Sequence, residues 1–139
     1  MNASAYLQFH GQCEEAFAFY AKTFGGEVMA LLRWSDMPGG AMPAGAVPPE
    51  LARKIMHGEI RIGAATLMGA DPPPERYSKP AGFGVTLAVE SGADADRIFT
   101  ALCDGGSVTM PIGETFFAHR FGMVTDRYGI PWLIVHRKS

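Results

Sequence analysis

Two short stretches of the sequence carry side chains that can move protons or bind a metal ion. His57 and Glu59 stand two positions apart in KIMHGEIRIG, and Glu114 and His119 flank two phenylalanines in ETFFAH. Imidazole and carboxylate groups serve as general acids and bases and as ligands of divalent cations. Both stretches are therefore candidates for a functional site, and Glu114 and His119 are the candidate catalytic residues.

Each pair also has a purely structural interpretation. A spacing of two places His57 and Glu59 on one face of a strand, where they are candidate ligand-binding residues. The same spacing is typical of the polar face of a half-exposed strand, and we favour that interpretation. Phenylalanine rings beside Glu114 predict a pKa raised by desolvation, which suits a general acid or base. Equally, Glu114 and Thr115 tie the loop to a neighbouring strand while the rings fill the core.

Other polar and aromatic residues are weaker candidates. Gln8 is a candidate hydrogen-bonding contact for a ligand, and Phe116 and Trp132 are candidate aromatic contacts. Trp132 fits the core of a strand equally well. Asp126 precedes Arg-Tyr-Gly, a pattern typical of a turn whose carboxylate accepts backbone hydrogen bonds. Cys13 opens a predicted helix, and we interpret it as a small buried residue rather than a nucleophile.

An internal repeat predicts the elements that position these residues. When the sequence is compared with itself at an offset of 80 residues, four features occur in both copies. They are an alternating, strand-like segment, a helix with apolar residues at helical spacing, a Gly-Gly pair and a second strand. The closing segments KIMHGEIRIGAATLMGAD and HRFGMVTDRYGIPWLIVH each predict two strands joined by a turn, and they match at an offset of 64. The matched pairs include Leu7 with Leu87, Phe19 with Phe99, Gly25 with Gly105, and Gly58 with Gly122.

Two copies of a βαβββ unit predict an α+β fold in which each helix covers one face of its own sheet. We expect a single domain over residues 1–139, with module 1 at about 1–72, a linker at about 72–80 and module 2 at about 81–139. The segment 36–50 is rich in proline and glycine and fits neither helix nor strand. Its length predicts a lid or a mobile loop.

The composition excludes several classes of partner. With 12 Lys and Arg against 14 Asp and Glu, the formal charge is -2, so nucleic acid is not an expected partner. No apolar run is long enough to span a bilayer, and MNASAYLQFHGQ lacks the order of a signal peptide, so we expect no membrane contact. The two cysteines fall in predicted helices and need no disulfide. These features predict a cytoplasmic protein.

Three stretches together resemble one known group of proteins. YLQFHGQCEEAFAFYAKTFGGEV, MHGEIRIG and ETFFAHRFGMVTDRYGIPW, in that order, are similar to the PhnB-like branch of the glyoxalase, bleomycin-resistance and dioxygenase superfamily, also called vicinal oxygen chelate proteins. The resemblance implies that the eight strands of the two modules curl into a half-open barrel, usually completed as a homodimer. It does not fix the chemistry, because members either react small molecules around a divalent metal or only sequester a drug.

The resemblance also locates the superfamily's metal ligands, which come from the first and last strand of each module. These positions fall near Ser4, Leu67, Gly84 and Leu133, within one or two residues. None of these side chains offers an ionised or imidazole donor. We therefore expect no standard metal site and no cofactor.

Two functions follow from these expectations. The first is binding of a small, partly apolar molecule in the cavity between the two modules, without a metal. The alternative is a lyase, isomerase or dioxygenase-type enzyme acting on a small oxygenated substrate, with Glu114 or His119 as the proton carrier. That enzyme would use a non-standard divalent metal on His57, Glu59 or His119. Whether the protein is an enzyme stays open at this point.

Overall fold

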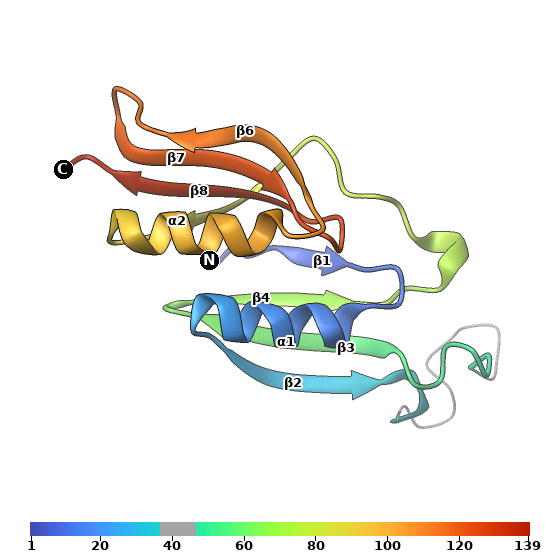
Figure 1. Cartoon of the computed structure of the whole chain (residues 1–139). Helices are drawn as coiled ribbons and strands as arrows, with labels where there is room; N and C mark the ends of the chain where they lie inside the picture. The colour runs from blue at the N-terminus through green and yellow to red at the C-terminus, as the bar shows by residue number, and fades with distance from the viewer. Residues whose placement is uncertain (37–46) are drawn as a thin grey trace. The chain divides into compact units, whose positions relative to one another are not determined.

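The computed structural model describes residues 1–36 and 47–139, which form two compact units, Met1–Ser78 and Lys79–Ser139 (Figure 1). The division falls within the stretch 72–80. Most of the predicted lid at 36–50 lies outside the described residues. Within the described ranges, no helix is long and apolar enough to cross a membrane.

The first unit is a four-stranded sheet with one helix. Strand β1 pairs in parallel with β4, the other neighbours are antiparallel, and the strand order is β1-β4-β3-β2. The elements are β1 (Tyr6–Gln8), α1 (Cys13–Phe24), β2 (Glu27–Arg33), the 3-10 helix η1 (Trp34–Asp36), β3 (Ile55–Ile62), β4 (Ala65–Ala70) and the 3-10 helix η2 (Pro74–Arg76).

The second unit repeats this plan. Its strand order is β5-β8-β7-β6, with β5 parallel to β8 and the other pairs antiparallel. The elements are β5 (Val85–Ala88), α2 (Gly92–Cys103), β6 (Ser107–Gly113), β7 (Ala118–Thr125) and β8 (Pro131–Arg137). The predicted α+β fold of two tandem βαβββ modules is confirmed.

Glycines in the sheets let each helix pack closely. In the first unit, a Cβ at Gly69 would lie 2.8 Å from Cζ of Phe17, and one at Gly58 would lie 3.0 Å from Cε2 of the same ring. Phe17 is fully buried on α1. In the second unit, Gly122 makes the same room for Phe99 of α2. Each helix is therefore seated over strand glycines, and the opposite face of each sheet carries no helix of its own unit.

The two helices match each other at an offset of 79, one residue less than predicted. Helix α1 ends directly before Gly25, whereas Asp104 stands between the end of α2 and Gly105. Gly25 and Gly105 both have positive φ, 73° and 74°, which glycine adopts without strain. In packing, the counterpart of Phe99 is the fully buried Phe17 and not Phe19, because Phe17 lies over Gly58 as Phe99 lies over the matched Gly122.

Candidate functional site

The helix-free face of the first sheet brings several of the candidate residues together. Strand pairing aligns Ala30, Glu59, Met68 and Tyr6 in one row across β2, β3, β4 and β1. Their neighbour Leu7 is buried on the α1 side, so this row lies on the opposite face. We call this face the open face of the first sheet.

His57 and Gln8 lie on the same open face, each two residues from a member of that row. The His57 Nε2 lies 3.9 Å from Glu59 Oε2, with 30% and 39% of the two side chains exposed. The ring centroids of Tyr6 and His57 are 6.5 Å apart. The structure therefore brings Gln8, His57 and Glu59 together, and it adds Tyr6, which the sequence did not single out.

Tyr6 is a proton donor rather than a base in this setting. Burial raises the pKa of the Tyr6 phenol. The phenol is therefore protonated at neutral pH and can donate a hydrogen bond to a ligand oxygen. Together with the Glu59 carboxylate and the Gln8 amide, it gives the open face both donors and acceptors.

The structure shifts three of the four positions expected for metal ligands. Leu67 is buried, at 7% exposure, and pairs with Ile60 on the α1 side, so Met68 is the residue of β4 that faces away from the helix. Ser4 and Gly84 precede their strands. The corresponding residues that face away from the helix are Tyr6 and Met68 in the first sheet, and Thr86 and Leu133 in the second, where Gly122 and its partner Ile134 face α2.

These four residues remain poor donors for a divalent cation, because none is a histidine, aspartate or glutamate. Across residues 1–36 and 47–139, no three or more His, Cys, Asp or Glu side chains cluster closely enough to hold an ion.

The environment and the pKa of Glu114 differ from the sequence prediction. Glu114 lies 2.9 Å from Lys138 Nζ, and its side chain is 65% exposed. The hydrogen bond and the positive charge of Lys138 lower the pKa of Glu114. The predicted desolvation by phenylalanine is wrong, since Phe116 is 93% exposed and shields nothing. Glu114 is therefore ionised at neutral pH and unsuited to act as a general acid.

His119 lies beside a second histidine. The ring centroids of His119 and His136 are 5.0 Å apart, and His136 Nδ1 is buried without a hydrogen-bond partner among the described residues. A register shift between Ala118 and Arg120 sets His119 out of the regular pairing of β7 with β8. Within its own unit, His119 therefore has the His136 imidazole beside it.

Trp132 and Asp126 serve the core of the second unit. Trp132 is 1% exposed, and its indole N–H donates to Asp126 Oδ2 at 2.8 Å. Asp126 Oδ1 accepts from the backbone N–H groups of Tyr128 and Ile130, which confirms its predicted role in the turn. The core interpretation of Trp132 is favoured over ligand binding, because its ring is enclosed.

Cys13 is confirmed as a buried helix residue. Its side chain has no exposure, and burial, followed by the charges of Asp71 and Glu14, raises the pKa of its thiol. Its backbone N–H donates to Asp71 Oδ1 at 2.9 Å. A protonated, enclosed thiol is not a nucleophile.

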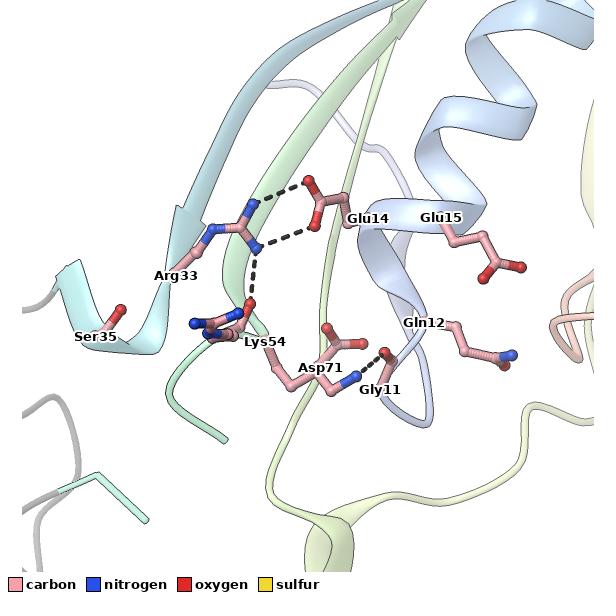
Figure 2. Close-up of a pocket in the computed structure, with 9 residues that line it drawn as sticks. Gly11, Gln12, Glu14, Glu15, Arg33, Ser35, Lys54 and Asp71 are labelled. Carbon is pink, nitrogen blue, oxygen red and sulfur yellow. Dashed lines mark hydrogen bonds and ion pairs between the residues drawn. The ribbon is translucent and has the colours of Figure 1, made fainter. Parts of the chain in front are cut away.

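A polar cavity of about 660 Å³ lies in the first unit, at the start of α1 (Figure 2). Its residues come from separate segments that the structure brings together, and no single stretch of sequence marks it. One wall is a two-pronged ion pair, in which Arg33 Nη1 and Nη2 lie 3.0 and 2.9 Å from the Glu14 oxygens. The lining residues are Gly11, Gln12, Glu14, Glu15, Arg33, Ser35, Arg53, Lys54 and Asp71.

Comparisons with known proteins agree with this architecture. Protein YjdN of Escherichia coli K12 is 35% identical over 140 residues, covering 96% of this chain and 94% of its own. The crystal structure of protein PA1353 from Pseudomonas aeruginosa is 38% identical, with a TM-score of 0.87 and coverage of 100% and 99%. A Bacillus cereus structure described as a 3-demethylubiquinone-9 3-methyltransferase, PhnB protein, is 22% identical, with a TM-score of 0.79 and coverage of 98% and 99%.

Two helix-covered βαβββ modules in one chain define the fold of the glyoxalase, bleomycin-resistance and dioxygenase superfamily, whose solved members share it. A sequence model of one branch, described as 3-demethylubiquinone-9 3-methyltransferase, matches residues 2–135. The chain belongs to that PhnB-like family.

Proposed function

We propose that the protein binds a small, partly apolar molecule on the open face of its first sheet, without the divalent metal of the superfamily's enzymes. The row formed by Tyr6, Met68 and Glu59 carries this proposal. It places a hydrogen-bond donor, a flexible thioether and a carboxylate side by side, flanked by Gln8 and His57. A small number of polar groups set among apolar ones is typical of small-molecule sites. That the second module forms the opposite wall of this binding site is a prediction.

The metal-free part of the proposal has a direct test. Protein purified without chelator should contain less than one divalent ion per chain by elemental analysis, and adding Zn²⁺ or Mn²⁺ should not raise its melting temperature. The reason is that Tyr6, Met68, Thr86 and Leu133 supply no strong ligand. One stoichiometric ion per chain would instead favour an enzyme with a non-standard metal site.

Ligand binding is tested by a thermal-shift screen of small carboxylic and aromatic compounds. A true ligand at 100 times its Kd should stabilise the wild-type protein by about 2.7 kcal/mol. Tyr6→Phe and His57→Ala should reduce this shift, because both remove polar groups from the open face. Lys22→Ala, which shortens an exposed side chain on α1, the helix that covers the opposite face of the first sheet, is the control. Equal shifts in all four proteins would place the ligand elsewhere.

We do not extend the family's methyltransferase description to this chain. A methyl-donor cofactor of the nucleotide type favours a glycine-rich turn between a strand and a helix. Here the turn between β1 and α1 reads Phe-His-Gly-Gln-Cys, and Lys54 fills it, since Lys54 Nζ donates to Gly11 O at 2.9 Å. The residues at this turn therefore do not fit such a cofactor.

We also propose that the protein is a cytoplasmic homodimer. Edge strands β2 and β6 expose apolar side chains, namely Met29, Leu32, Val108 and Met110, and bare edges favour pairing with another chain. The two free cysteines are compatible with a reducing compartment. Analytical ultracentrifugation at micromolar concentration should give the mass of two chains, and a monomer there would contradict the proposal.

A further inference from the structure

We propose that the polar cavity at the start of α1 is a second binding site, for a small molecule carrying a carboxylate or a phosphate group. The site goes beyond the function proposed above, because none of its lining residues belongs to the open face. A volume of about 660 Å³ is in the range of small-molecule sites. Arg53 and Lys54 are the groups that would hold the anion.

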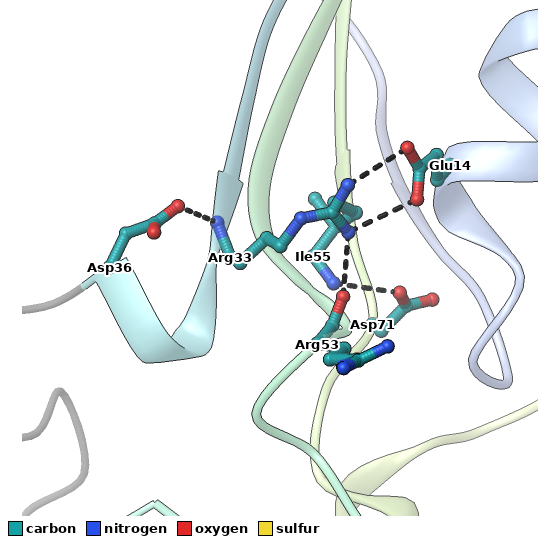
Figure 3. A network of polar contacts seen from close by, with 6 residues as sticks. All are labelled: Glu14, Arg33, Asp36, Arg53, Ile55 and Asp71. Carbon is teal, nitrogen blue, oxygen red and sulfur yellow. Dashed lines mark hydrogen bonds and ion pairs between the residues drawn. The ribbon is translucent and has the colours of Figure 1, made fainter.

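The acidic groups of the cavity are already engaged, which leaves cationic groups for a ligand. Glu14 is held by both terminal nitrogens of Arg33. Asp71 is 2% exposed, and its two oxygens accept from the N–H groups of Cys13 and Ile55, at 2.9 Å each. Figure 3 shows the bond from Ile55. The Cys13 N–H at the start of α1 is thus already hydrogen-bonded to Asp71. The proposal therefore rests on the side chains of the cavity and not on the helix end.

Arg53 is placed to meet an anion. Its carbonyl accepts from Arg33 Nη1 at 2.7 Å, which fixes its backbone beside the Arg33 and Glu14 pair. Its guanidinium makes no ion pair or hydrogen bond with the part of the chain that the structure describes. Lys54, the next residue, uses one of its three N–H donors on Gly11 O. A planar guanidinium and an ammonium group that line the same cavity match carboxylate and phosphate oxygens.

Two observations bear on specificity. Glu15, the remaining acidic residue of the lining, is exposed and lies on the far side of the helix start from Arg33 in Figure 2. The second module lacks this lining, since Gly113 stands where the repeat predicts the counterpart of Arg33. The counterpart of Asp71 is His136. Asp71 directly follows Ala70, whose carbonyl accepts from the Phe9 N–H, and His136 directly follows Val135, whose carbonyl accepts from the Val89 N–H. The charged lining is therefore particular to the first module and does not follow from the fold that both modules share.

The test is isothermal titration calorimetry at low ionic strength, with inorganic phosphate and, separately, with succinate. The wild-type protein should bind at least one of them with millimolar affinity. Arg53→Gln should weaken binding roughly tenfold, the loss of one charge-assisted hydrogen bond. Glu14→Gln should strengthen it, because the change frees Arg33 and removes a negative charge. Arg76→Gln, an exposed arginine outside the cavity, should behave as wild type.

Comparing the two anions tells a phosphate site from a carboxylate site. Tyr6→Phe should leave anion binding unchanged, so failure of this proposal is distinguishable from failure of the open-face proposal. Each variant is first shown to be folded by circular dichroism. No binding of either anion to the wild type, full binding by Arg53→Gln, or weaker binding by Glu14→Gln would overturn the assignment.

Discussion

Replacing Asp71 by alanine should lower the free energy of unfolding by about 2–5 kcal/mol, because it leaves two buried backbone N–H groups without an acceptor. Those groups belong to Cys13, the first residue of α1, and Ile55, the first residue of β3. Urea unfolding followed by circular dichroism measures the change. A loss below about 1 kcal/mol would show that water replaces the carboxylate.

The size of this effect follows from how many segments Asp71 joins. Its carboxylate ties the start of α1 to the start of β3. The Asp71 carbonyl, which accepts from the Trp34 indole at 2.9 Å, is retained in the alanine variant and does not contribute to the loss. Burial raises the pKa of Asp71, while hydrogen bonds from Ile55, Cys13 and Gly11 and the charge of Lys54 act in the opposite direction. Burying this carboxyl group costs free energy, and the hydrogen bonds that it accepts from backbone N–H groups offset that cost.

The matched control for this prediction is Glu75→Ala. Glu75 is exposed on η2, so its loss should change the free energy of unfolding by less than about 0.5 kcal/mol. A similar loss in both variants would mean that the effect comes from general charge removal rather than from the hydrogen bonds of Asp71.

Adding one methyl group at Gly122 should destabilise the second unit by about 1–3 kcal/mol, the usual range for overpacking a core. A Cβ there would lie 2.7 Å from Cε1 of Phe99, 3.0 Å from Cα of Ile112 and 3.1 Å from its Cβ. The backbone of β6 cannot yield as a flexible side chain can. Thermal unfolding of Gly122→Ala should therefore show a clearly lower melting temperature than the wild type.

Two further variants identify the cause. Gly113→Ala is the control, since a Cβ at Gly113 meets nothing within 4 Å and should cost little. Phe99→Leu, combined with Gly122→Ala, should lose less stability than the sum of the two single changes, because the smaller side chain relieves the contact. Strict additivity would locate the strain at Ile112 instead of Phe99.

Much of the fold was predictable from local patterns. Alternation of apolar and polar residues placed Gln8, His57 and Glu59 on strands, and the Gly-Gly pairs marked where both helices end. The turn role of Asp126 and the burial of Cys13 also followed from residue type and position. These features depend on neighbours within a few residues, which one sequence displays directly.

Contacts between distant segments were not predictable in the same way. The sequence placed phenylalanine beside Glu114, but the pairing of β7 with β8 brings Lys138 to it and lowers its pKa. Residue spacing also gave no indication that the Trp132 indole donates to Asp126, or that Arg33 pairs with Glu14. Each of these results depends on strand register, and a change of one residue reverses the face of every side chain.

The sequence by itself determined the duplicated βαβββ order, the buried face of each helix and the identity of the residues able to donate or accept protons. Only the tertiary structure decided that Tyr6 and Met68 join Glu59 in one row, and that Arg53 and Lys54 line a cavity with the Glu14 and Arg33 ion pair as one wall. The physical reason is that periodicity fixes local conformation, whereas register and helix placement fix which charges and rings meet across the chain.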